Sequence, residues 1–369
     1  MRIWTKLTTF LKEEVHHLAT IHPSDRMWQM PVAAALASGL PLLVGAWFDH
    51  LDYGLVSSLG GMVFLYLPPT PLSHRMVALM ASAFGMIACY ALGVISHQVP
   101  VLMMLALTFT AILVTMVCRF YRVGVPGSLF FIMAASIGAY SPVDILQVPL
   151  MVGLLAMGSL LACLIAFFYS LHTLRLRAPQ PVQPIPEPTF DFVVYDSVVI
   201  GAFVGVSLAL AQVLHMEKAY WVPVSCLAVV QGASLRAVWS RQLQRILGTG
   251  FGLILAWGLL SLPLDKWSVA LTMMVLAFII ETAVVRHYTF AAMFITPLTI
   301  LLADATSLGQ GSPDALIQAR FIDTCVGSFV GLLGGVCLHS PRVRAALGAG
   351  MRRLIPERFK PSPQDRTNA

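Results

Sequence analysis

The chain has 369 residues, of which 58% are apolar and 11% charged, and its mean hydropathy is +0.81. A soluble domain carries about a quarter charged residues, so this composition excludes an ordinary soluble protein and indicates a bilayer protein. The formal net charge of +6 is explained below by membrane topology, and no nucleic-acid partner is expected.

Residues 1–30 are predicted to form a cytoplasmic amphipathic segment. Apolar side chains recur there at helical spacing with lysines and glutamates between them. This pattern is typical of a helix on a membrane lipid surface, and equally of a helix that packs on another protein domain. The segment lacks the apolar core and cleavage site of a secretory signal peptide.

Twelve apolar segments follow, and they predict an all-α polytopic membrane protein with about twelve transmembrane helices. They lie at about 31–48, 55–67, 77–95, 101–118, 129–139, 150–169, 198–214, 220–230, 246–262, 269–285, 290–303 and 321–338. Between the two groups of six, residues 175–197 are proline-rich and predict an extended linker. Residues 341–369 form a basic tail.

The distribution of charge predicts the orientation. If the chain crosses the membrane twelve times, all of its 23 lysines and arginines except Lys218, Lys266 and Arg320 fall on one side. Positive residues concentrate in cytoplasmic connections. We therefore expect a multi-pass protein of the bacterial inner membrane with both termini, the linker and the basic tail in the cytoplasm.

The two groups of spans resemble each other. Residues 31–174 and 198–340 align at an offset of 167 without a gap from Tyr53 to Tyr121, which places Ser58 opposite Ser225. Low identity with equal loop lengths favours duplication. Because each half has six spans, the two repeats should be parallel and related by an axis along the membrane normal.

Short segments edged by glycine or proline recur at corresponding positions of the two halves, near 55–67 and 220–230. Such pairs indicate a binding site in transporters, because backbone groups freed by a helix break must line a cavity or be covered by protein. The candidate substrate path comprises Ser57, Ser58, Tyr220, Trp221, Pro223, Ser225, Gln231, Arg241 and Arg245.

Several of these residues have two interpretations. Arg241 and Arg245, at the inner mouth of segment 246–262, either draw organic anions toward the path or only anchor the topology. Tyr220 and Trp221 either belong to an interfacial aromatic belt or stack an aromatic substrate. Gln231 has no apolar role and is expected to line a polar cavity.

Three ionisable residues within the spans are candidates for a proton relay or gate. Glu281 either relays protons or pairs with a basic loop residue. Arg320 and Asp323, three apart on one helix face, form either a local pair or a gate. The chain has no GxxxxGK[ST], HExxH or GxSxG motif, and its six cysteines lack metal spacing. No enzyme, metal or cofactor is predicted.

Two stretches of the second half resemble a known family. The stretch YWVPVSCLAVVQGASLRAVWSRQLQRILGTGFGLILAWG (220–258) and the stretch ARFIDTCVGSFVG (319–331) resemble signature blocks of the fusaric acid resistance family, the aromatic acid exporters. The matching residues are Arg245, Gly248, Thr249 and Gly252 in the first block and Arg320, Asp323, Thr324 and Gly327 in the second. Gly248 and Gly252, with small-xxx-small spacing, also suit close helix packing, as Gly327 does.

The resemblance implies export of small aromatic or other organic acids, driven by the proton gradient. Family members often work with a periplasmic adaptor protein, and distantly related plant malate channels are dimers with six spans per subunit, so an oligomer is compatible with the resemblance. This chain has no sizeable cytoplasmic domain, which weakens the adaptor expectation. The alternatives are a passive organic-anion channel and a membrane scaffold subunit that transports nothing.

Overall fold

A computed structural model describes residues 23–24, 26–185, 187–304 and 313–353. The expected surface helix at the N-terminus and most of the basic tail lie outside these residues. The described part is largely helical and contains no β-strand, in agreement with the all-α prediction.

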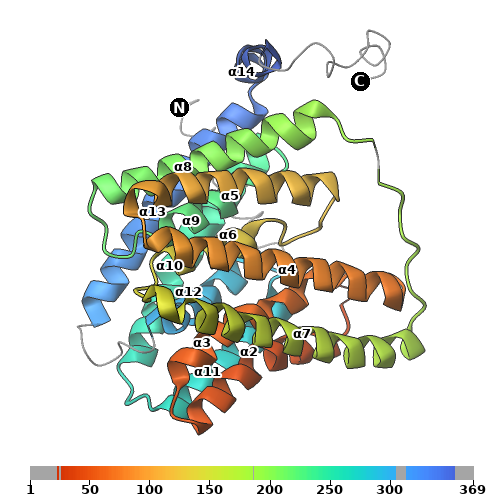
Figure 1. Cartoon of the computed structure of the whole chain (residues 1–369), viewed down its shortest axis with the longest axis vertical. Coiled ribbons are helices and arrows are strands. Elements are labelled where there is room, and N and C mark those ends of the chain that lie inside the picture. The colour runs from red at the N-terminus through yellow and green to blue at the C-terminus, as the bar shows by residue number, and fades with distance from the viewer. Residues whose placement is uncertain (1–22, 25, 186, 305–312, 354–369) are drawn as a thin grey trace, which may run out of the picture.

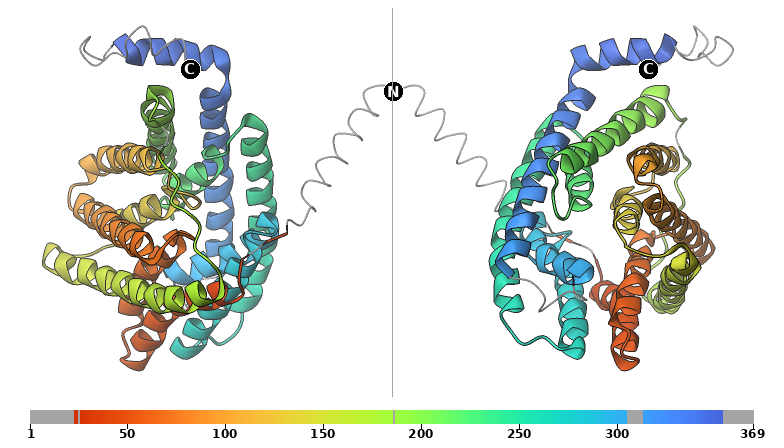
Figure 2. Two further views of the ribbon diagram at one scale, coloured as in Figure 1. Left: turned by 90° about the vertical axis from the view of Figure 1, so that its right-hand side faces the viewer. Right: turned by 60° about the vertical axis from the view of Figure 1, so that its left-hand side comes forward.

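The helices follow the apolar segments in chain order (Figure 1). The first half contains α2 (Gln29–Trp47), α3 (Leu51–Gly61), η1 (Met62–Tyr66), α4 (Leu72–His97), α5 (Pro100–Phe120), α6 (Leu129–Ala139), η2 (Ile145–Gln147) and α7 (Val148–Leu176). The second contains η3 (Asp191–Tyr195), α8 (Asp196–Val213), α9 (Trp221–Val230), α10 (Leu235–Leu260), α11 (Lys266–Ala283), α12 (Tyr288–Asp304), α13 (Pro313–His339) and α14 (Pro341–Arg353). Figure 2 shows α14 turning away at the end of α13.

Within the described residues, eight helices are long and apolar enough to cross a membrane. They are α2, α4, α5, α8, α10, α11 and α13, together with α7 and its preceding turn. The other four apolar helices are shorter. At 1.5 Å per residue, the ten residues of α9 span roughly 15 Å, about half of a bilayer core.

Each half packs its helices in the same pairs. In the first half α3 lies along α7 and α4 along α6, and in the second half α9 lies along α13 and α10 along α12. Two large contacts join the halves: α2 packs on α11, and α5 packs on α8. A smaller one lies between α6 and α9. We call the α2–α11 and α5–α8 contacts the seams.

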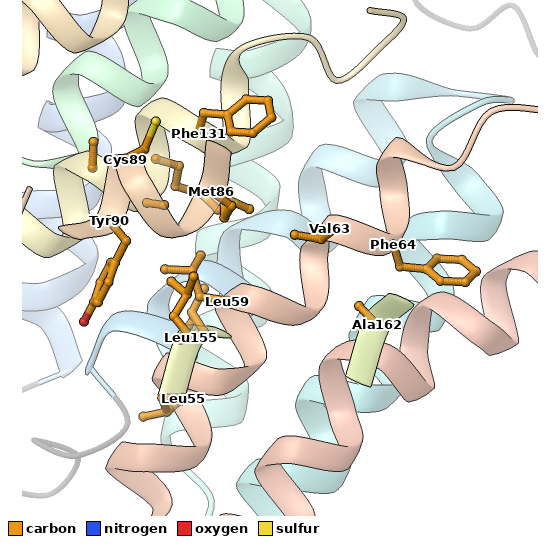
Figure 3. Close-up of a cluster of buried hydrophobic side chains, with 14 of the residues drawn as sticks. Leu55, Leu59, Val63, Phe64, Met86, Cys89, Tyr90, Phe131, Leu155 and Ala162 are labelled. Atoms are coloured by element: carbon orange, nitrogen blue, oxygen red, sulfur yellow. The ribbon is translucent and has the colours of Figure 1, made fainter. Parts of the chain in front are cut away.

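The interior of the first half is apolar and tightly filled. Leu59, Met86 and Leu155 come from α3, α4 and α7 and are at most 2% exposed, and they meet in one cluster (Figure 3). By contrast, Phe84 and Phe109 on the long helices are more than 60% exposed. Large exposed apolar side chains along membrane-spanning helices are suited to lipid.

Candidate functional site

The short helix α9 is enclosed by protein. All ten of its residues, including Pro223, are buried, and α13, α8, α6 and α10 pack around it. Trp221 is 1% exposed, so its ring lies neither in an interfacial belt nor open to an aromatic substrate. Tyr220, just before the helix, is half-buried and lies beside the ring of Tyr140 at 5.8 Å between centroids.

The structure corrects the position expected for Arg241 and Arg245. Helix α10 begins at Leu235 rather than near residue 246, so neither arginine lies at the mouth of the helix. Arg245 is about ten residues into α10, roughly 15 Å along its axis, and is 7% exposed. Arg241, one turn earlier, is half-buried.

The Arg245 guanidinium reaches α9. Its Nη2 donates a hydrogen bond to Ser225 Oγ at 3.3 Å. Its buried Nε has no hydrogen-bond partner among the described residues. A buried charge is costly unless it is paired and hydrogen-bonded, so the Nε–H of Arg245 is available to donate a hydrogen bond to a bound anion.

A second guanidinium lies on the same face of α9. Arg320 on α13 is 4% exposed, and its Cζ lies 3.8 Å from the centroid of the Trp221 ring. Its Nη2 donates to Thr299 Oγ1 on α12 at 3.1 Å. Tryptophan is the strongest aromatic partner for a cation, so Trp221 holds Arg320 in place.

Asp323 is the third buried charged residue near α9. It lies three residues after Arg320, on the face of α13 whose Gly327 packs on the main chain of Val222 and on Ser225. Asp323 is 1% exposed, and its Oδ2 has no hydrogen-bond partner among the described residues.

The site therefore joins four helices. Trp221 and Ser225 lie one turn apart on α9, Arg245 comes from α10, Thr299 from α12, and Arg320 with Asp323 from α13. Two guanidinium groups against one carboxyl favour an anionic ligand, and guanidinium matches a carboxylate in a two-pronged geometry. Thr299 was missed by the sequence analysis, because a threonine in an apolar segment gives no signal.

The remaining predicted residues lie outside this group. Gln231, at the far end of α9, donates to Ser128 Oγ at 2.7 Å. Ser57 and Ser58 are on α3 in the other half, where Ser58 is buried. Gly248 and Gly252 face α12 at Ala292 and Met293, which is the close packing expected from their spacing.

Glu281 is joined to a distant arginine. It accepts a hydrogen bond from Arg26 Nη1 at 2.9 Å, and Arg26 also donates to its carbonyl oxygen at 3.2 Å. Arg26 precedes α2, so this ion pair lies on the seam between α2 and α11.

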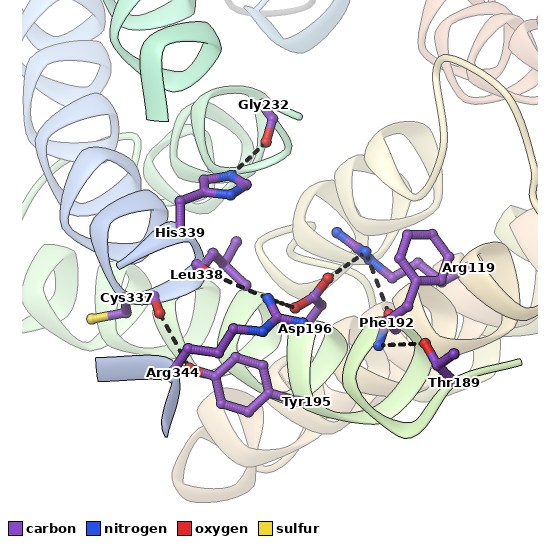
Figure 4. Close-up of polar contacts among 10 residues, drawn as sticks. All are labelled: Arg119, Thr189, Phe192, Tyr195, Asp196, Gly232, Cys337, Leu338, His339 and Arg344. Atoms are coloured by element: carbon purple, nitrogen blue, oxygen red, sulfur yellow. Dashed lines mark hydrogen bonds and ion pairs between the residues drawn. The ribbon is translucent and has the colours of Figure 1, made fainter. Parts of the chain in front are cut away.

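The other seam carries an ion-pair cluster that sequence reasoning missed (Figure 4). Asp196, at the start of α8, accepts from Arg119 of α5 at 2.8 Å and from Arg344 of α14 at 2.9 Å. Arg344 also stacks over Tyr195, with its Cζ 5.0 Å from the ring centroid. The three residues are far apart in sequence, so only an acidic residue at the start of an apolar segment could have signalled the cluster.

These features define a polytopic helical membrane protein with a buried cationic site. Residues 200–334 match the family model described as fusaric acid resistance protein-like, which confirms the resemblance of the second half. The second half is therefore similar to this family.

One relative is similar over part of its own length. An uncharacterized membrane protein of Bacillus subtilis (strain 168), YvaC, is 30% identical over 157 residues, which are 41% of this chain and 25% of that protein. The chain thus matches only about a quarter of that relative's length. No solved structure matches the chain.

Proposed function

We propose that the protein exports small organic acids, aromatic carboxylic acids among them, across the bacterial inner membrane, and that Arg245 binds the carboxylate. The observation that carries this proposal is the buried Arg245 guanidinium, with its Nε unpartnered among the described residues, inside the part that matches the family model. Arg320, fixed by Trp221 and Thr299, adds positive charge beside it.

The proposed architecture has twelve spans in two parallel six-helix repeats, with both termini in the cytoplasm. The equal helix pairing within each half supports the repeats, and so do the two seams, which exchange when the halves are exchanged. The short helices α3, α6, α9 and α12 would cross the core only together with the non-helical residues at their ends, surrounded by the longer helices. This arrangement is suited to a site near the midplane.

Asp323 is proposed to carry the coupled proton. Ionisable residues inside a membrane bundle commonly mark proton relays, and Asp323 lies on the α13 face that also presents Arg320. A proton taken up by this carboxyl raises the net positive charge beside the anion, so proton and substrate occupancy would be linked electrostatically.

The test is efflux of 4-hydroxybenzoate from proteoliposomes, with and without a pH gradient. Arg245→Gln should reduce flux at least tenfold, because a hydrogen bond to a charged group contributes about 1.5–3 kcal/mol. The matched control, Arg241→Gln, one turn earlier on α10, should keep the flux within about twofold, since a half-buried charge contributes little.

Asp323→Asn separates coupling from binding. We expect flux that no longer responds to the pH gradient while a downhill component persists. Wild-type flux that ignores the gradient would contradict proton coupling and favour a passive anion channel. Equal flux in wild type and Arg245→Gln would contradict the anion site itself.

A further inference from the structure

Each seam carries a buried ion pair, and the two pairs are reversed relative to the aligned helices: α5 carries an arginine where α11 carries a carboxylate. On the α5–α8 seam, the arginine belongs to the first half (Arg119) and the carboxylate to the second (Asp196). On the α2–α11 seam, the first half again supplies the arginine (Arg26) and the second the carboxylate (Glu281). In both of these buried pairs the first half thus supplies the positive charge and the second half the negative one. At the other end of the α2–α11 seam an exposed pair, Asp49 with Lys266, has the reverse sense, but an exposed pair contributes little to the contact.

The two pairs occupy equivalent places. Each joins the C-terminal part of the third long helix of one half (α5 or α11) to the chain at the start of the first helix of the other (α8 or α2). Farther along each seam a glycine of the first helix receives a side chain: Gly205 faces Thr108, and Gly39 faces Met274. The packing of the two seams is therefore similar, whereas their buried ion pairs differ in which of the aligned helices carries the arginine.

We infer that these ion pairs are a pairing code: each seam accepts the opposite half and rejects a second copy of the same half. The inference rests on the proposed two-repeat architecture and not on transport. If two first halves paired through such seams, Arg26 would face Arg119, and like charges in a partly buried contact repel. If two second halves paired, Asp196 would face Glu281.

Burial strengthens the electrostatic preference for the opposite half. The side chains of Asp196 and Glu281 are each 11% exposed, so water screens the pairs weakly and an unmatched charge would be costly. On the α5–α8 seam, Arg344 belongs to the same half as Asp196 and holds it in place by binding its other carboxylate oxygen (Figure 4). Specificity of this kind is typically built from repulsion between wrong partners.

The experiment inverts the charges in full-length chains. An acidic chain carries R26E/R119E, and a basic chain carries D196K/E281K/R344E, so each chain has repelling seams within itself. When the two are co-expressed, the first half of the acidic chain fits the second half of the basic chain, and the remaining halves keep their native charges. We give each chain a different affinity tag. We expect a mixed, domain-swapped dimer that is recovered after two successive affinity purifications, one for each tag.

Two further chains control for folding. One chain that carries all five reversals has complementary seams again and should elute as a monodisperse monomer like the wild type. A chain with R175E/R286E, which changes the same amount of charge at exposed positions, should form no mixed dimer with the basic chain. The inference is overturned if the fully inverted chain folds but the mixed dimer is absent, or if the acidic chain alone dimerises as readily.

Discussion

The short helices α3 and α9 have the same packing but different chemistry around them. Each lies along a long helix of its own half, where Gly158 of α7 meets the main chain of Ser57 and Gly327 of α13 meets that of Val222. Around α9 are Arg245, Arg320 and Asp323, all buried. The position that aligns with Arg245 in the first half is Ala78. The two short helices thus share their packing, whereas these three charged residues occur only around α9.

The largest effect should come from the close glycine packing that α3 and α9 share. Gly158→Val and Gly327→Val each place a side chain against a main-chain carbonyl that cannot move aside. Overpacking of this kind costs about 3 kcal/mol or more when the backbone must shift. Both variants should therefore lose their monodisperse peak in size-exclusion chromatography.

The control for this pair is Gly153→Val, on the same helix α7, where an added side chain meets open space. It should elute like the wild type. If Gly327→Val alone were tolerated, the packing of α3 and α9 would differ more than the structure indicates.

The next effect is specific to the second half. Trp221→Phe retains an aromatic ring but weakens its attraction for Arg320, at a cost of about 1–2 kcal/mol from the cation–π contact and the smaller ring. We expect a lower melting temperature together with reduced efflux. Trp267→Phe is the matched control, because Trp267 is 36% exposed and packs edge-on against Trp47. Equal losses of melting temperature and efflux in both variants would mean that Trp221 contributes only its side-chain volume.

A finer comparison uses the aligned serines. Ser225→Ala removes the hydrogen-bond partner of Arg245, and about 1 kcal/mol corresponds to roughly a fivefold weaker apparent affinity in efflux assays. Ser58→Ala, at the same place on α3, should leave the affinity unchanged because no arginine aligns beside it. An equal change in both variants would indicate a substrate path that uses both halves.

The sequence was sufficient to predict where helices occur but not where all of them begin. Helix α6 starts and ends at the predicted residues, 129 and 139, since nearly all of its residues are apolar. Helices α10 and α13 begin at Leu235 and Pro313, well before the apolar segments. The parts that precede the apolar segments contain polar residues such as Gln242 and Arg320, which are buried against other helices, and hydropathy does not register such burial.

The site was partly predictable for a similar reason. Arg245, Arg320 and Asp323 stood out because charges are rare within membrane spans and because they fall in the family's sequence blocks. The contact between Arg320 and Trp221, the role of Thr299 and the Asp196 cluster depend on residues far apart in the chain. Such contacts follow from the packing of helices, which one sequence does not specify.

The smallest effect concerns how the aligned helices α5 and α11 begin. Helix α5 starts with Pro100 after a residue that makes no side-chain cap, whereas α11 is capped by Asp265, whose Oδ1 accepts from the Ser268 N–H at 2.9 Å. Hydrogen bonding with Ser268, through its side chain first and its N–H second, lowers the pKa of Asp265 below its usual 3.8. A carboxyl with a lowered folded-state pKa stabilises the protein fully above its unfolded pKa and loses that contribution as pH falls through the folded value.

The cap of α11 should therefore weaken only below about pH 4. Asp265→Ser retains a neutral cap and should remove this part of the acid dependence of the melting temperature, measured in detergent from pH 6 to about pH 3. Above that window the two proteins should differ little, because both have a capped helix. The aligned residue in the first half, Gln98, does not titrate and instead donates to the carbonyl of Val143 at 2.7 Å, so Gln98→Ser should leave the pH profile unchanged. A steeper acid loss in Asp265→Ser than in the wild type would contradict the assigned role of the carboxylate, because a neutral cap has no proton to gain.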